Sequence, residues 1–155
     1  MIDESLDIMI YALGRQDPDE WLHDNEAETN ALIKQNDTQF KYALDRYKYP
    51  NRYPDENGPN FQNNMFDRAA EILKDLNTRI ADNGALIDDY NTLADYAIFP
   101  FIRQFANVDK DRFHALGLKP LENWLTQHLE SDLFSSIMEK LKPWKAGDEP
   151  VIFGA

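Results

Sequence analysis

Basic and tyrosine side chains alternate over residues 40–53, a segment that reads FKYALDRYKYPNRY. Four of the sixteen Lys and Arg residues of the chain lie in this segment, against a single acid. Guanidinium and ammonium groups bind anions, and tyrosine rings offer flat surfaces with a polar edge. The candidates for a pocket that binds an anionic, partly apolar ligand are Tyr42, Arg46, Tyr49 and Tyr53. Residue types alone favour a structural alternative, in which the cations offset a helix dipole and the tyrosines pack a helical hairpin.

Thr92 and Asp95 have the spacing of a helix N-terminal capping box. In such a box the threonine hydroxyl accepts from the backbone N–H of Asp95, while the carboxylate accepts from the N–H of Thr92. The box opens the apolar run ADYAIFPFIRQF, so both donors should be buried, and each would cost about 1–3 kcal/mol if unpaired. A helix N-terminus also holds a carboxylate in its ionised form. The pair therefore predicts a structural role for Asp95, with a catalytic acid as the weaker alternative.

Glu4 and Ser5 precede another apolar helical segment. A hydroxyl beside the free backbone N–H groups of a helix N-terminus can form an anion-binding site. Ordinary helix capping explains the same residues, and from the local sequence alone it is the favoured reading.

Other catalytic and metal-binding motifs are not recognisable in this sequence. It has no cysteine, which removes disulfides, thiolate metal ligands and thiol nucleophiles. The three histidines are scattered without the spacing of metal ligands. Neither a glycine-rich phosphate loop nor a nucleophile elbow occurs. The sequence therefore predicts no metal site and indicates no catalytic residue.

Composition indicates one globular domain. The 155 residues are 43% hydrophobic, enough to fill a core, and the net charge of −12 argues against nucleic acid as a partner. The N-terminal MIDESLD lacks the basic region of a signal peptide, and no run approaches the ~18 apolar residues of a membrane span. We therefore expect a cytoplasmic protein with no membrane contact.

Apolar residues recur at helical spacing through most of the chain, which predicts an all-α fold. Trp21 and Leu22 are expected to dock a polar connector at 16–25 onto the body, and Trp144, Ile152 and Phe153 to pin an extended tail. The expected helices span residues 4–13, 26–49, 61–81, 93–105, 110–116, 120–130 and 132–141.

Two of these segments are apolar on more than one face. The helix at 93–105 is apolar on all sides, as expected at the centre of a domain, and Pro100 should kink it. The helix at 4–13 must also be covered on several sides, yet it lies at the start of the chain. We therefore expect either a preceding segment or another subunit to supply that cover.

Taken together and in this order, the motifs resemble the glutathione S-transferase family over nearly the whole chain. GALIDDYNTLADYAIFPFIRQF resembles the buried helix of the family's C-terminal domain, and PLENWLTQHLESDLF the helices that follow it. NDTQFKYALDRYKYPNRY resembles a segment of a bacterial subgroup. The resemblance implies a remnant of a thioredoxin-like domain at 1–15, its last helix, then a linker at 16–25 and a glutathione transferase C-terminal-like helical bundle at 26–155.

The same resemblance implies glutathione as a co-substrate and no metal. Glu4 and Ser5 resemble the acid–serine pair that holds the γ-glutamyl end of glutathione, and the Tyr42–Tyr53 segment would line the electrophile pocket. The family's catalytic residue belongs to the thioredoxin-like domain and has no counterpart here. Asn91 also replaces the apolar residue often found before the capping threonine, which weakens the expectation of a hydrophobic staple there.

Three hypotheses follow. The chain is the helical half of a glutathione transferase, active on a small electrophile only with a thioredoxin-like half; or a non-enzymatic helical interaction module of the same fold; or a truncated product without activity. The expected partners are a second copy in a homodimer or a thioredoxin-like N-terminal half.

Overall fold

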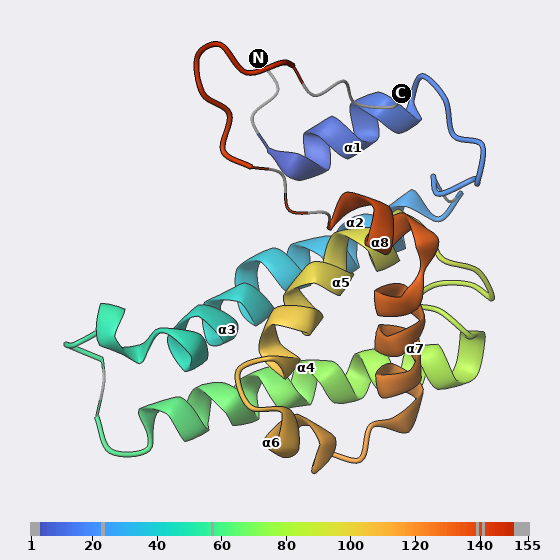
Figure 1. The fold of residues 1–155 in the computed structure, drawn as a ribbon. Helices are drawn as coiled ribbons and strands as arrows, with labels where there is room; N and C mark the ends of the chain where they lie inside the picture. Colours follow the sequence, from blue (N-terminus) through green and yellow to red (C-terminus); the bar gives the residue numbers. More distant parts are fainter. Residues whose placement is uncertain (1–3, 23, 57, 139, 141, 151–155) are drawn as a thin grey trace.

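The described part of the computed structural model comprises residues 4–22, 24–56, 58–138, 140 and 142–150, and it contains helices and no strand (Figure 1). This confirms the predicted all-α class. The α-helices are α1 (Ser5–Leu13), α2 (Glu26–Gln35), α3 (Lys41–Lys48), α4 (Phe61–Asn83), α5 (Leu93–Ala106), α6 (Lys110–His114), α7 (Lys119–Glu130) and α8 (Asp132–Ile137).

The expected helix at 26–49 is one continuous path with a change of winding at its middle. Between α2 and α3 lies a π-helical turn, η1 (Asn36–Phe40), where Asn36-Asp37 interrupts the apolar stripe. A π turn adds a residue to one turn of helix and so shifts the register of the side chains beyond it. Both Asn36 and Phe40 are buried, so the turn keeps this face directed into the bundle.

The long helical path and α4 form the predicted hairpin, and α7 also packs against α4 (Figure 1). The connection begins with a short 3-10 turn, η2 (Pro50–Arg52), where Pro50 ends the helical spacing. Aromatic rings fill the hairpin near its connecting loop: the ring centroid of Phe66 lies 5.4 Å from that of Tyr47 and 5.3 Å from that of Phe105. At the other end Gly84 closes α4 at a φ of +110°, a conformation that favours glycine.

Helix α5 lies at the centre, but one of its sides is incompletely covered. Ile98, Ile102 and Phe105 are buried in the core. Tyr96 is half-buried and Pro100 is exposed. The expectation that α5 would be enclosed on all sides is therefore wrong for the face that carries Tyr96 and Pro100, which lies toward α1.

Helix α1 has no buried side chain. It lies beside the bundle rather than within it (Figure 1). The connector behind it docks through Trp21, whose ring stacks on Tyr96 at 3.7 Å and whose carbonyl accepts from the N–H of Leu93 at 2.8 Å. Leu22 is 42% exposed, so its expected docking role is wrong. The need for additional cover over α1, expected from its sequence, persists within the described residues.

The C-terminal region is less regular than expected. Helices α6 and α8 end at His114 and Ile137, a few residues before the expected 116 and 141. Trp144 is 64% exposed and does not pin the tail, while Ile152 and Phe153 lie outside the described residues. Among the helices described, none has the length and apolar character needed to traverse a bilayer.

Candidate functional site

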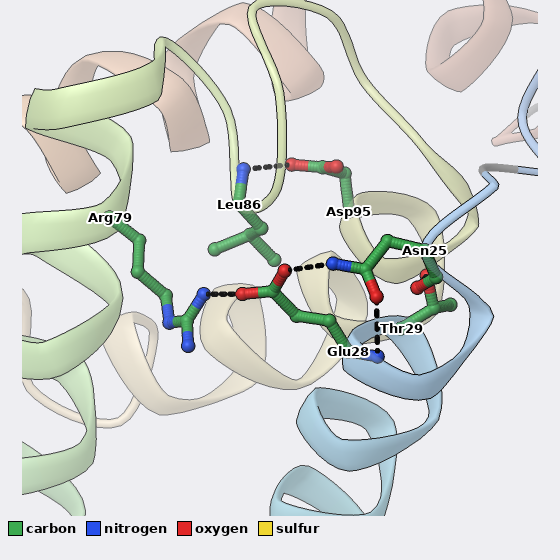
Figure 2. Close-up of polar contacts among 6 residues, drawn as sticks. All are labelled: Asn25, Glu28, Thr29, Arg79, Leu86 and Asp95. Carbon is green, nitrogen blue, oxygen red and sulfur yellow. Dashed lines mark hydrogen bonds and ion pairs between the residues drawn. The ribbon is translucent and has the colours of Figure 1, made fainter.

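Asp95 is fully buried and joins three parts of the fold. Its carboxylate accepts from the backbone N–H of Thr92 at 2.9 Å and from the Thr92 hydroxyl at 3.1 Å, within the predicted capping box. It also accepts from the N–H of Leu86 at 3.0 Å, a bond drawn in Figure 2, and from the indole N–H of Trp124 at 2.9 Å. With four donors directed at it, this carboxylate has little capacity left for a substrate, which favours the structural role over the catalytic one.

The bonds from Leu86 and Trp124 could not be inferred from the capping spacing. Leu86 belongs to the loop before α5 and Trp124 to α7, so Asp95 fixes the loop, the start of α5 and the middle of α7 at one point. A second polar connection closes the same end of the bundle. Glu28 of α2 accepts from both Arg79 of α4 and the side chain of Asn25 (Figure 2).

Three of the four predicted pocket residues, Tyr42, Arg46 and Tyr53, lie together. The positive charge of Arg46 is already paired with a carboxylate. The Arg46 guanidinium lies 3.6 Å from the ring centroid of Tyr42 and 4.1 Å from that of Tyr53. Two of its nitrogens donate to the carboxylate of Glu56, each at 2.9 Å. This pairing raises the pKa of Arg46 and lowers the pKa of Glu56, in each case mainly through their hydrogen bonds.

The fourth predicted residue, Tyr49, is not part of that cluster; its ring lies 4.0 Å from the Arg52 guanidinium. Glu56 was missed from the sequence because it belongs to the irregular loop before α4, ten residues beyond Arg46. It occupies the anion-binding face of Arg46 in bidentate geometry. The cluster therefore joins α3 to the loop before α4 through the pair of Arg46 and Glu56.

Glu4 and Ser5 lie at a cavity rather than in a closed cap. Glu4 is the N-cap residue of α1, yet its side chain makes no capping hydrogen bond. Both residues line a cavity of about 400 Å³, whose other walls include Lys41 of α3 and Phe101 of α5. The Lys41 ammonium lies 3.5 Å from the carboxylate of Asp37, which also lines the cavity, and 4.8 Å from the ring centroid of Phe101.

A second cavity of about 390 Å³ lies between α1, α5, α7 and α8. It shares Met9, Tyr96 and Pro100 with the first cavity, so the two are neighbouring parts of the space between α1 and α5. No residue pattern in the sequence indicated it, because its walls come from four separate elements. Its signal was the apolar excess of α5, which is expected in the core, and of α1, which is expected to be covered by a preceding segment or another subunit.

His128 is the buried titratable residue of this second cavity. It is 4% exposed, and its Nε2 has no hydrogen-bond partner among the residues that the structure describes. Burial lowers the pKa of His128, while the nearby charge of Asp95 acts in the opposite direction and is the smaller effect. The ring is therefore neutral at pH 7.

In the part of the chain that the structure describes, no group of three or more His, Asp or Glu side chains could hold a metal ion. Comparison with known proteins identifies no relative, since no family model, curated protein or solved structure matches the chain.

Proposed function

We propose that this chain is the helical, electrophile-binding half of a glutathione transferase-like protein, which transfers or conjugates glutathione when a thioredoxin-like half completes it. The observation that carries the proposal is the cavity beside α1. Glu4 and Ser5, which resemble a glutathione-binding pair, share this cavity with Lys41 of the long helical path. A ligand held at the start of α1 would thus face the helix to which the electrophile is assigned.

The start of α1 offers the chemistry that a γ-glutamyl group requires. Backbone N–H groups of the first helical turn have no intrahelical partner, and the helix dipole favours an anion there. The Glu4 carboxylate, which caps nothing, is available to an amino group, and the Ser5 hydroxyl to a carboxylate. The thiolate of glutathione would be activated by the thioredoxin-like half, which holds the catalytic residue in the family that the sequence resembles.

The electrophile would lie against the tyrosines of the long helix and its loop. The positive charge of Arg46 is neutralised by Glu56, so recognition at Tyr42 and Tyr53 would be mainly apolar and aromatic. Tyr49 lies apart from them and would contribute only at the end of the helix.

Helix α1 would supply the docking face for the thioredoxin-like half, whether that half is joined to this chain or separate from it. Ile8, Ile10 and Tyr11 are 53%, 43% and 51% exposed, although this helix is strongly apolar. Exposed apolar residues gathered on one helix are a typical feature of interaction surfaces. The same observation favours the second candidate function, a non-enzymatic interaction module, and is compatible with the expected homodimer.

The test is a calorimetric titration of glutathione into the chain, alone and mixed with a thioredoxin-like half from a glutathione transferase. We expect the added half to strengthen glutathione binding at least about tenfold, or roughly 1.4 kcal/mol. Ser5→Ala should remove most of this gain, since it deletes a ligand hydroxyl. Ser135→Ala, at an exposed position of α8, is the matched control and should leave binding unchanged.

Two results would contradict the proposal. One is the absence of glutathione binding in the mixture at millimolar concentration; the other is binding that Ser5→Ala does not weaken. If the thioredoxin-like half binds the chain and glutathione has no effect, the interaction module becomes the better description.

A further inference from the structure

A third cavity, of about 290 Å³, lies between α5, α6 and α7. Phe113 and Leu125, both buried, give it an apolar wall, while Asn107 and Thr126 are among the polar residues around it. Its volume lies just below the range of roughly 300–1,000 Å³ in which drug-sized ligands bind. A ligand that fits this cavity is therefore close to the size of a single amino acid.

Glu122 of α7 carries the negative charge of this cavity. Its side chain is 11% exposed, and its Oε2 accepts from the Lys119 ammonium at 2.9 Å and lies 3.1 Å from Nδ1 of His114. The hydrogen bond from Lys119 is the main reason why the pKa of Glu122 is lowered, so the carboxylate is ionised at pH 7. Its Oε1 is buried and has no hydrogen-bond partner among the described residues. A charged oxygen removed from water without a donor is unfavourable, and a donor brought by a ligand would correct this.

Two cations line the same cavity, Arg103 of α5 and Lys110 of α6. Neither lies within ion-pair distance of a carboxylate in the part of the chain that the structure describes. The other half-buried arginines each have such a carboxylate: Arg46, Arg79 and Arg112. In a chain with 28 acids and a net charge of −12, an acidic partner for either cation would have been easy to provide.

Opposite charges thus line one small cavity without meeting each other. The Glu122 carboxylate pairs with His114 and Lys119, and not with Arg103 or Lys110 across the cavity. A purely anionic ligand would be repelled by Glu122, and a purely cationic one by the two cations. A molecule that carries both charges would satisfy both walls, because its ammonium can donate to Oε1 while its carboxylate accepts from the cations.

We propose that this cavity binds a zwitterionic α-amino acid with an aliphatic side chain. Its ammonium lies at Glu122, its carboxylate at Lys110 and Arg103, and its side chain against Phe113 and Leu125. The site shares no residue with the cavity assigned to glutathione and requires no thioredoxin-like half. It therefore goes beyond the proposed function, and glutathione binding can fail without affecting it.

The test is an NMR titration of the isotope-labelled full chain with L-leucine. Two further titrations use molecules of the same shape that each lack one charged group: isoamylamine, which has no carboxylate, and isocaproate, which has no amino group. We expect L-leucine to bind with a Kd below about 5 mM, and each of the other two to bind at least about tenfold more weakly. The shifted signals should come from residues around the cavity, including the side-chain amides of Asn107 and Asn123.

Two variants test the two walls separately. Glu122→Gln keeps the size of the side chain and removes its charge, and Lys110→Met removes a cation at an exposed position. Each should weaken L-leucine at least about fivefold. Glu71→Gln is the matched control, since Glu71 also pairs with a lysine three positions away, Lys74, but on the exposed surface of α4. It should leave the affinity unchanged, and far-UV circular dichroism should report the same helix content for every variant.

The proposal is overturned if L-leucine causes no saturating shifts up to about 20 mM. Equal affinity for isocaproate and L-leucine would also overturn it, since the site would then recognise an anion only. Equal affinity for isoamylamine would do the same for a cation. If Glu122→Gln does not fold, the comparison of the three ligands and Lys110→Met still decide the outcome: unchanged L-leucine affinity in Lys110→Met contradicts the proposal.

Discussion

The bundle and the layer formed by α1 and its connector differ in how far their apolar side chains are covered. In the bundle, Ile102 is completely buried and the charge of Asp95 is bonded from four directions. In the outer layer, α1 has no buried side chain, and two cavities separate it from α5. An apolar segment is stabilised when its side chains are removed from water, and this requires other elements to lie next to it in space.

The difference also indicates where the molecule can bind a ligand or a partner. A closely packed interior offers no room for a ligand. Incompletely covered apolar walls do, and their burial by a ligand or partner is favourable. Both cavities, the one at Glu4 and Ser5 and the one at His128, lie in the space next to α1. Stability is therefore expected to reside in the bundle and the recognition of glutathione or a partner in the outer layer.

The largest expected contrast comes from truncating one apolar side chain in each region. Phe105→Ala removes a ring that is 1% exposed and should lower the free energy of unfolding by about 3–5 kcal/mol. Ile8→Ala, on α1, removes a side chain that is 53% exposed and should change it by less than about 0.5 kcal/mol. Urea unfolding followed by circular dichroism measures both; comparable losses would contradict the division into two regions.

The next effect concerns the polar junction in the bundle. Asp95→Ala leaves buried donors on Leu86, Thr92 and Trp124 unpaired and should cost about 2–4 kcal/mol in urea unfolding. Asp75→Ala, at an exposed position of α4, is the control and should cost less than about 0.5 kcal/mol. If Asp95→Ala lowers the free energy of unfolding by no more than the control does, the four hydrogen bonds do not hold the bundle together.

The smallest expected effect is a pH dependence located in α7. The pKa of Glu122 is lowered, first by its hydrogen bond from Lys119 and further by His114. A carboxyl with a lowered folded-state pKa stabilises the fold above its unfolded value of about 4.3, and the gain is lost as pH falls through the lower folded value. The stability difference between the wild type and Glu122→Gln should therefore be present at pH 6 and shrink toward zero in acid. A difference independent of pH would exclude this linkage.

Much of the architecture could be predicted because its causes are local. Apolar spacing and helix-ending residues such as Pro50 and Gly84 predicted the helices, with errors of a few residues at α6 and α8. The capping spacing of Thr92 and Asp95 likewise depends on a single helical turn. Burial of Ile98 and Phe105 followed from the apolar character of α5.

What could not be predicted depends on residues that are far apart in the sequence. Glu56 neutralises Arg46 from a loop without regular spacing, and Trp124 reaches Asp95 across 29 positions. Which side of α5 remains uncovered depends on where α1 lies. The sequence shows only that both segments are apolar, so it could not predict this side. By itself the sequence determined which segments are helical and which faces are apolar, because backbone hydrogen bonding and side-chain periodicity are local. Only the tertiary structure decided which charges are paired and which apolar faces remain open, because pairing and burial depend on distances between elements.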